Sequence, residues 1–178
     1  MLSRAGLSGV RAGRWRLAVA KRGATRAIDV LTGAGVTFTV HEYAHDSSVA
    51  SYGEEAAIAL GLPADRVYKT LVVLLDGSRP AVAVVPVSRQ LNLKAFAAAL
   101  GAKRAELSAP ADAERLTGYV VGGISPLGQR RRLPAVLDAG AQAFATIHVS
   151  AGRRGLEVEL PPADLLLLAG AITAPIAV

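Results

Sequence analysis

Two long runs of aliphatic and β-branched residues limit the folds that this chain can adopt. Val67–Leu75 (VYKTLVVLL) and residues 81–87 (AVAVVPV) each have the length and composition of a strand, and Asp76-Gly77 lies between them. An Asp-Gly pair between two such runs predicts a chain reversal, here somewhat longer than a two-residue hairpin. Pro86 lies near the end of the second run, where a missing backbone donor costs least. The chain is therefore expected to contain an antiparallel pair of strands.

The rest of the chain alternates between patterns for short helices and short strands. N-cap residues and closing glycines predict helices at 25–31, 54–60, 93–100, from Ser108 onward, and at 161–168. Strands are predicted at 36–41, 104–107, 133–137, 145–149 and 156–160. In the last of these, LEVEL, apolar and acidic residues alternate as in a half-exposed strand. No repeat or internal linker interrupts these elements, which predicts one α+β domain.

Most of the positive charge lies at the start of the chain. The chain has 20 Lys and Arg residues against 14 Asp and Glu residues, a formal net charge of +6. Residues 1–26 hold seven of the basic residues and none of the acidic ones, so 13 basic and 14 acidic residues remain elsewhere. A body that is nearly neutral can contact a polyanion only through a local patch. Three consecutive arginines, Arg130, Arg131 and Arg132, are the best candidate.

Residues 1–22 are interpreted as a basic extension of a domain that covers residues 23–178. Their longest uncharged run near Trp15 is too short for a secretory signal. A transit peptide usually has more serine, so a disordered extension or a start codon assigned too far upstream is preferred. No stretch has the roughly 18 apolar residues of a membrane span. The absence of cysteine suits a cytoplasmic protein.

Residues 117–132 (TGYVVGGISPLGQRRR) contain the strongest candidate for a binding loop. Gly122 and Gly123 can adopt backbone angles closed to other residues and let a ligand approach the main chain. The amides of such a turn can converge on an anion, Ser125 adds a hydroxyl, and guanidinium groups suit phosphate. A plain glycine turn followed by a solvated basic run also fits, because short glycine motifs are weak evidence alone.

Among the other polar residues, Lys69 is notable because it stands between apolar residues in a predicted strand. Such a lysine either reaches a functional pocket or protects the rim of an edge strand. A Ser125–His45–Asp46 triad is not expected, because adjacent His and Asp rarely make the required hydrogen bond and no nucleophile elbow is present. His148 is expected to be a packed or half-exposed sheet residue. Without cysteine or a close-spaced His/acid pattern, no metal site is predicted.

Several long motifs occur in the order of a known family. EYAHD, VYKTLVV, NLKAFAAALGAK, TGYVVGGISPLGQRRRLP and ATIHVSAGRRGLEVEL closely resemble the YbaK family of Cys-tRNA(Pro) deacylases, which is related to the editing domain of bacterial prolyl-tRNA synthetases. The resemblance covers about residues 25–172. It implies a mixed, barrel-like β structure surrounded by helices. It also implies removal of amino acids wrongly attached to tRNA, mainly cysteine from proline tRNA.

The resemblance assigns the candidate site residue by residue. The family's lysine falls on Lys69 and its site tyrosine on Tyr43. Its GGISP loop falls on Gly122, Gly123, Ile124, Ser125 and Pro126. The acidic residue after RGL, often aspartate in the family, is Glu157, which is one methylene longer. The family's basic run, often Lys-Lys-Arg, is Arg130, Arg131 and Arg132, which keeps the charge.

The mechanism implied by the resemblance needs no cofactor, metal or protein nucleophile. The substrate's cysteine thiol attacks its own ester carbonyl and leaves as a cyclic thiolactone, so this ester hydrolase is formally lyase-like. The glycine amides would donate to the developing oxyanion or hold the terminal ribose, and Lys69 would bind terminal phosphate or ribose. Tyr43 would shape the pocket. The arginines would contact the acceptor stem of the tRNA partner, and prolyl-tRNA synthetase is a second candidate partner.

Two alternatives stay open on the sequence alone. One is an editing deacylase of different specificity, such as one for Ala-tRNA(Pro) with water as nucleophile, since the sequence does not define which amino acid enters. The other is a module that binds tRNA or a synthetase without turnover. The presence of both Lys69 and the GGISP sequence argues against the binding module, because binding alone does not require that loop.

Overall fold

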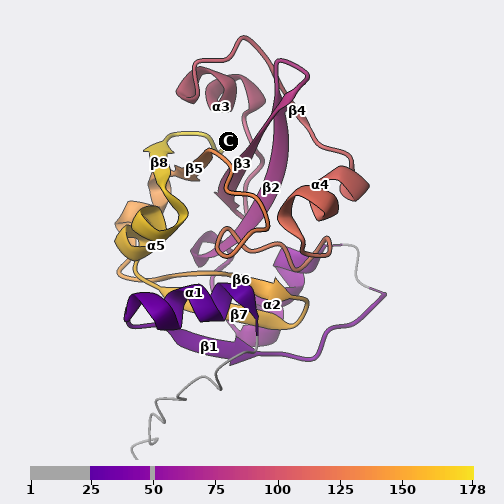
Figure 1. Cartoon of the computed structure of the whole chain (residues 1–178). Coiled ribbons are helices and arrows are strands. Elements are labelled where there is room, and N and C mark those ends of the chain that lie inside the picture. The colour runs from indigo at the N-terminus through magenta and orange to yellow at the C-terminus, as the bar shows by residue number, and fades with distance from the viewer. Residues whose placement is uncertain (1–24, 49–50) are drawn as a thin grey trace, which may run out of the picture.

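The computed structural model describes residues 25–48 and 51–178, so the predicted extension lies outside the described residues. Helices and strands alternate along this part of the chain (Figure 1). The helices are α1 (Arg26–Ala34), α2 (Tyr52–Leu60), α3 (Leu93–Ala99), α4 (Pro110–Thr117) and α5 (Pro162–Ala169). The strands are β1 (Thr39–Glu42), β2 (Val67–Leu75), β3 (Arg79–Pro86), β4 (Ala105–Leu107), β5 (Ala135–Asp138), β6 (Ile147–Arg153), β7 (Leu156–Leu160) and β8 (Ala171–Ala174). Short 3₁₀ turns precede β2 and follow β5.

All eight strands join one mixed sheet. Its order is β1-β7-β6-β2-β3-β5-β8, and β4 pairs with β2 outside this path. β2 is central because it pairs antiparallel with β3 along its length, parallel with β6 at its start and antiparallel with β4 at its end. In Figure 1, β1, β7 and β6 lie together near α1 and α2, while β2 and β3 run from them toward α3. The predicted α+β class with a mixed sheet and surrounding helices is confirmed.

The predicted strand pair and most helix ends are confirmed. β2 has the predicted bounds, and the three-residue turn before β3 contains Asp76 with φ 51° and Gly77 with φ 77°. Thr25 caps α1 by accepting a hydrogen bond from the Ile28 amide, and Asn92 caps α3 in the same way. The hairpin and these helices follow from local turn and capping chemistry.

Four local predictions were wrong or incomplete. The first strand lies at Thr39–Glu42, not at 36–41, because its register is set by pairing with β7. Ala109 is the N-cap of α4, while the Ser108 hydroxyl donates to the Ala109 carbonyl. β6 extends to Arg153, beyond the predicted end. β8 was not predicted, since its short AITA sequence becomes a strand through parallel pairing with β5.

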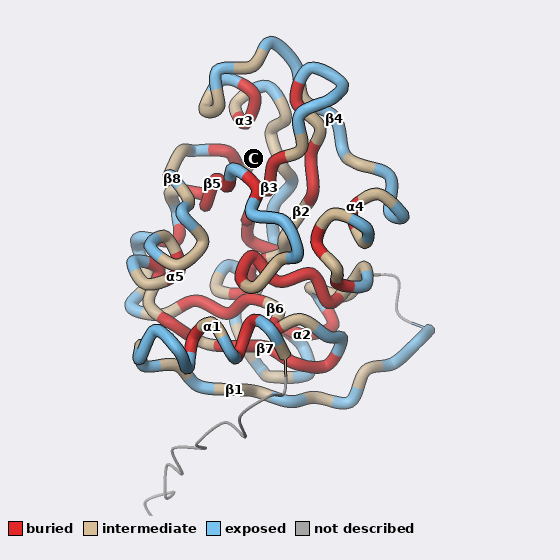
Figure 2. Tube along the Cα trace, in the orientation of Figure 1, coloured by how far each residue is buried: buried red, intermediate tan, exposed pale blue. Residues whose placement is uncertain are grey.

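The core lies on both sides of the central strands. Figure 2 shows a mostly buried trace through β6, β3 and β5. One apolar cluster packs α1 and α5 against β6 and β7, and another packs α3 against β2, β3 and β5. None of the helices in residues 25–48 and 51–178 is long and apolar enough for a membrane span. β2 contributes Tyr68 to the first cluster and Val73 and Leu75 to the second, so it lies where the two clusters meet.

Candidate active site

A pocket of about 290 Å³ opens beside β2. Parts of the chain that are far apart in sequence supply its walls. Residues on the pocket wall include Tyr52 and Gly53 of α2, Lys69 and Thr70 of β2, Ala113 of α4, Val121, Gly122 and Ile124 of the glycine loop, Ser150 of β6 and Glu157 of β7. A mostly apolar wall with a few polar groups is typical of a small-molecule site.

Two buried polar atoms in this wall have no hydrogen-bond partner among the described residues. They are Thr70 Oγ1 and Glu157 Oε2. Buried polar groups in folded proteins are nearly always paired, because an unpaired one keeps its full desolvation cost. Two unpaired groups in the same pocket indicate that a polar ligand completes their hydrogen bonding.

Glu157 is the most perturbed acid of the site. It lies opposite His41 of β1 and Ser150 of β6, and only 6% of its surface is exposed. Burial raises its pKa to about 8, so the free protein holds a neutral carboxyl at pH 7. The prediction of a half-exposed strand was wrong for this residue, because β7 lies between two other strands and Glu157 faces the pocket. Alternation alone does not show which face of a strand is covered.

Replacing Glu157 with Gln should change how stability depends on pH. The native carboxyl keeps its proton up to a pKa of about 8, whereas the unfolded one loses it near 4.5. The wild-type free energy of unfolding should therefore fall by about 2 to 4 kcal/mol, relative to Glu157→Gln, between about pH 5 and pH 9. Urea unfolding of both proteins across this range measures the difference. Parallel pH profiles would show that the buried carboxyl does not titrate in this way.

Lys69 lines the same pocket. Its Nζ donates to the Arg89 carbonyl oxygen at 2.8 Å, and burial lowers its pKa, opposed by the Glu54 carboxylate. β2 is a central strand of the sheet, but at Lys69 it pairs only with Val85 of β3, because β6 pairs no further than Tyr68 and β4 begins to pair at Val73. The pocket therefore occupies a gap in the sheet beside this lysine. A lysine on a central strand beside a pocket is placed to bind an anionic or hydroxyl group of a ligand.

Tyr43 lies behind the pocket and is not part of its wall. Its side chain packs against the cluster of Ala56, Ala57, Val67 and Val87. Burial, and then the nearby Glu157 carboxyl, raise the pKa of the Tyr43 phenol to about 12. The phenol therefore stays protonated at neutral pH. Tyr43 can support the pocket and Glu157, but it cannot act as a base at neutral pH.

The two glycines of the loop are required for different steric reasons. Gly122 has φ 86°, and a Cβ there would lie 2.6 Å from the Tyr52 ring. A Cβ on Gly123 would lie 2.8 Å from backbone atoms of Arg153. The loop therefore packs directly on α2 and on the β6–β7 turn, as close backbone approach requires.

The amides of the loop are used unequally. The Gly123 amide donates to the Val120 carbonyl oxygen at 2.9 Å, which closes the turn. The expected donation from Gly123 to the substrate is therefore revised. The amides of Gly122 and Ile124 have no hydrogen bond to another described residue, and both residues line the pocket. The third loop residue of the pocket wall, Val121, donates its amide to the Glu114 carboxylate, so Gly122 and Ile124 offer the unused amides of this wall.

Tyr52 and Arg154 also form the site, although no sequence pattern assigned them to it. The Arg154 guanidinium lies 4.8 Å from the centre of the Tyr52 ring, and its Nε donates to the Val121 carbonyl oxygen at 2.9 Å. Arg154 thus connects the β6–β7 turn to α2 and to the glycine loop. Only the RRGL motif beside Glu157 could have pointed to it, and that motif does not show what the arginine contacts.

The remaining predicted residues lie outside the pocket wall. Ser125 is 0% exposed and its hydroxyl accepts a hydrogen bond from the Leu127 amide. Pro126 lines a second, smaller cavity of about 150 Å³, together with Arg132. All three consecutive arginines are exposed, and none forms an ion pair within the part of the chain that the structure describes. They are free to contact a large ligand, but not one confined to the pocket.

No histidine base serves a nucleophile here. None of the chain's three histidines is in the pocket wall. His45 Nδ1 pairs with the Glu55 carboxylate at 2.9 Å, and the buried Ser125 hydroxyl accepts from the Leu127 amide. These contacts agree with the expectation that Ser125, His45 and Asp46 do not act as a triad. His148 was expected to be a packed or a half-exposed residue of a sheet, and it is packed. Burial lowers the pKa of His148 to about 4.

Residues 46–168 match the family described as the aminoacyl-tRNA editing domain. The chain belongs to this family. A relative from Enterococcus faecalis, named as the Cys-tRNA(Pro)/Cys-tRNA(Cys) deacylase EbsC, is 39% identical over 133 residues, which are 75% of this chain and 80% of the relative. The resemblance to the YbaK and prolyl-tRNA synthetase editing family is confirmed.

Other editing-domain proteins agree in sequence or in fold. The multifunctional Ser/Thr-tRNA deacylase ProXp-y of Escherichia coli (strain K12) is 30% identical over 148 residues, which are 81% of this chain and 86% of the relative. A solved structure described as a trans-editing enzyme for prolyl tRNA synthetase has a TM-score of 0.74 at 25% identity. The aligned part spans 86% of this chain and 95% of the chain in that structure. The pocket described above therefore lies in an editing-domain fold.

Proposed function

We propose that this editing-domain protein clears mischarged tRNA in trans, with Cys-tRNA(Pro) as its main substrate and Cys-tRNA(Cys) as a further one. The observation that carries the proposal is the pocket beside β2. It combines the Lys69 cation, the unpaired Thr70 and Glu157 groups and two available amides, without a histidine base. Such a site can position and polarise an ester, but it has no activated nucleophile of its own.

The missing nucleophile is supplied by the substrate in this proposal. The cysteine thiol attacks the carbonyl carbon of its own ester, so a C–S bond forms and the C–O bond to the terminal ribose breaks. The thiol proton ends on the released ribose oxygen, and the amino acid leaves as a cyclic thiolactone. The amides of Gly122 and Ile124 donate to the carbonyl oxygen as it becomes negative, which stabilises the transition state.

The charged side chains then orient the two ends of the substrate. Lys69 binds the terminal ribose or phosphate, replacing its contact with the Arg89 carbonyl. The Glu157 carboxylate accepts a hydrogen bond from the α-ammonium group of the amino acid. This positive charge favours the ionised carboxylate and lowers the raised pKa of Glu157. Tyr43 and Tyr52 support these groups from behind and beside the pocket. The roles of Ser125 and Pro126 are reduced to holding the loop.

The tRNA body contacts the arginine run in this proposal. Replacing Arg130 and Arg131 together with alanine should raise KM for charged tRNA and leave kcat little changed, because these side chains lie outside the pocket. The slope of log(kcat/KM) against log salt should become shallower by about one per lost phosphate contact. The matched control is Arg79→Ala with Lys94→Ala, which removes two exposed cations, one at the start of β3 and one in α3. Equal salt slopes in both double variants would contradict the docking surface.

A charged-tRNA panel tests the proposed function. Cysteinyl-, alanyl-, seryl- and threonyl-tRNA(Pro) and cysteinyl-tRNA(Cys) are incubated with the full chain and with a chain that begins at Gly23. We expect fastest release from Cys-tRNA(Pro), with thiolactone as the first product, and equal rates for the two chains. Absence of deacylation on every substrate would overturn the enzyme assignment in favour of the binding module.

A second specificity has an observation in its favour. The ProXp-y relative is named for Ser/Thr-tRNA, and the pocket holds an unpaired Thr70 hydroxyl that could bind a substrate hydroxyl. Faster release of serine, threonine or alanine, with free amino acid as product, would select a water-dependent editing reaction instead. We place either reaction in the cytoplasm, with prolyl-tRNA synthetase as the candidate partner. Co-elution with that synthetase checks the partner separately.

A further inference from the structure

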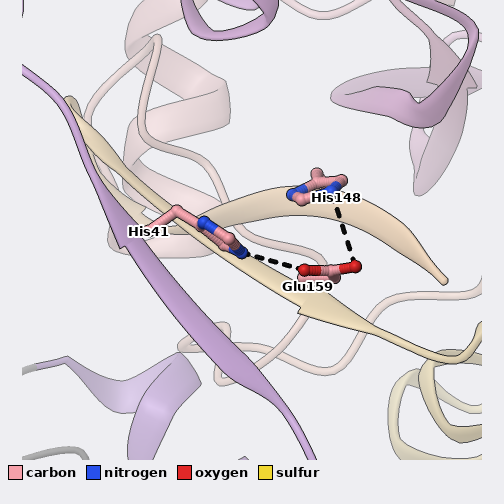
Figure 3. A group of neighbouring side chains, drawn as sticks. All are labelled: His41, His148 and Glu159. Carbon is pink, nitrogen blue, oxygen red and sulfur yellow. Dashed lines mark hydrogen bonds and ion pairs between the residues drawn. The ribbon is translucent and has the colours of Figure 1, made fainter. Parts of the chain in front are cut away.

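Three side chains from separate strands meet on the sheet face that carries Glu157. His41 comes from β1, His148 from β6 and Glu159 from β7 (Figure 3). His41 Nε2 lies 3.0 Å from Glu159 Oε2, and His148 Nε2 lies 3.9 Å from Glu159 Oε1. One candidate ligand atom from each residue can be chosen so that all three lie within 4.8 Å of one another. Pairing of the strands alone creates this cluster.

His148 is the unexplained member of the cluster. Only 1% of it is exposed, and neither ring nitrogen has a hydrogen-bond partner within residues 25–48 and 51–178. Burying an imidazole without any partner is costly, so such a residue usually has a ligand or a specific role. Its ring faces the Glu159 carboxylate and the His41 ring, whose centroid is 5.0 Å away. Nε2 of His148 therefore faces the cluster, at 3.9 Å from Glu159 Oε1.

We propose that His41, His148 and Glu159 bind a divalent transition-metal ion, with Zn²⁺ as the best fit. Two imidazole nitrogens and one carboxylate oxygen are a donor set typical of zinc, and a fourth position is left for water. Tetrahedral zinc with ligands at about 2.1 Å places ligand atoms roughly 3.4 Å apart. The candidate ligand atoms lie within 4.8 Å of one another, so the most distant of them have to approach by up to about 1.4 Å. His41 can make this movement because its side chain is 29% exposed, which also gives the ion a path of entry.

The surroundings orient the carboxylate for this role. Thr146 Oγ1 donates to Glu159 Oε1 at 2.6 Å, and Arg66 Nη2 lies 3.3 Å from the same oxygen. These contacts hold one oxygen and leave Oε2 facing His41, where an ion would replace the shared proton. Such outer contacts are characteristic of metal ligands. The positive charge of Arg66 lowers the affinity of the site for any cation. The two imidazole nitrogens offset this for transition-metal ions, which they bind better than they bind Mg²⁺ or Ca²⁺.

The bound ion would connect three neighbouring strands of the sheet. It would tie the edge strand β1 to β7 and β6. The ion would lie next to Glu157, which pairs in register with His41 of β1 and Ser150 of β6. Its expected effect is on stability rather than on the deacylation step, since none of the three ligands is in the pocket wall. The metal site is thus independent of the proposed function and can be tested apart from it.

Calorimetry with Zn²⁺ alone tests the site on the untagged full chain after treatment with a chelator. The chain has three histidines and no cysteine, and residues 1–24 contain no His, Asp or Glu, so few side chains compete. We expect one Zn²⁺ per chain. His41→Gln and Glu159→Gln should each weaken binding by about tenfold or more, because each removes a ligand. His45→Gln, which removes the histidine outside the cluster, should bind as the wild type does.

Two further measurements keep the result decisive. The unfolding temperature of the wild type and of His45→Gln should rise with Zn²⁺, and that of the two cluster variants should not. Co²⁺ should give the visible absorption of a four-coordinate site in the wild type and in His45→Gln. The same absorption should be missing from His41→Gln and Glu159→Gln. Thermal unfolding of the metal-free variants shows that they fold. Failure of the wild type to bind one Zn²⁺, or equal affinity in His41→Gln, would overturn the proposal.

Discussion

Replacing Lys69 with methionine should lower kcat/KM for Cys-tRNA(Pro) by at least about a hundredfold, which is the usual cost of removing one preorganised charged donor. Methionine keeps the length and packing of the side chain but removes the cation beside the pocket. In the proposed reaction the terminal ribose or phosphate then loses its anchor, and the ester is no longer held against the loop amides. Single-turnover deacylation with excess protein measures the loss.

Stability serves as the internal control for this variant. Burial lowers the pKa of Lys69, so the native state already disfavours its charge, and methionine should leave the unfolding temperature unchanged or higher. Lys94→Met, at an exposed position of α3, provides the matched change without a role in the pocket. If Lys69→Met retained full activity, the lysine would have no part in the reaction and the site would have to be redrawn around the loop.

Replacing Gly123 with alanine should reduce deacylation by about tenfold to a hundredfold, because a small misplacement of the reacting groups is costly. The new Cβ would lie 2.8 Å from the Cα and carbonyl carbon of Arg153 and 2.9 Å from the Arg154 nitrogen. These are backbone atoms and cannot rotate away, so the loop has to shift away from the β6–β7 turn. The shift moves the Gly122 and Ile124 amides, at a stability cost of about 1 to 3 kcal/mol.

Gly33→Ala is the matched control for this substitution. A Cβ at Gly33 meets no atom within 4 Å among the described residues, and the position is exposed in α1. The variant should be about 0.5 to 1 kcal/mol more stable, because alanine favours a helix over glycine, with unchanged activity. Deacylation rates and urea midpoints of the two alanine variants separate the loop from general effects. Equal activities would show that the position of the loop does not limit the reaction.

The sequence pattern was most informative where the chain interacts with itself locally. The β2–β3 hairpin, the Thr25 and Asn92 caps and the glycines that end α1 and α2 were all predictable, since each depends on residues a few positions apart. β8 was not, because its pairing with β5 depends on residues more than thirty positions away. Local propensity is a weak guide wherever such distant pairing decides the structure.

The candidate site divides along the same line. Lys69 and the glycine loop were found as motifs, and the structure brings Lys69, Gly122, Ile124 and Glu157 to one pocket. The motifs did not show that the Gly123 amide is used inside the turn, or that the Ser125 hydroxyl is buried and accepts a hydrogen bond within the loop. Tyr52 belongs to none of the motifs, and the RRGL motif that contains Arg154 does not show what this arginine contacts. Their place follows from their contacts with the loop and with each other.

By itself the sequence determined the class of fold, the central strand pair and the family, because periodicity, turn residues and long motifs are properties of the linear chain. Only the tertiary structure decided that Glu157 is buried and neutral. It also decided that His148 lies next to His41 and Glu159 while its ring nitrogens have no hydrogen-bond partner among the described residues. Burial and partnership come from strands that pair across more than a hundred residues. The pKa of an acid and the donor set of a metal site depend on such neighbours, and alternation along one strand cannot specify them.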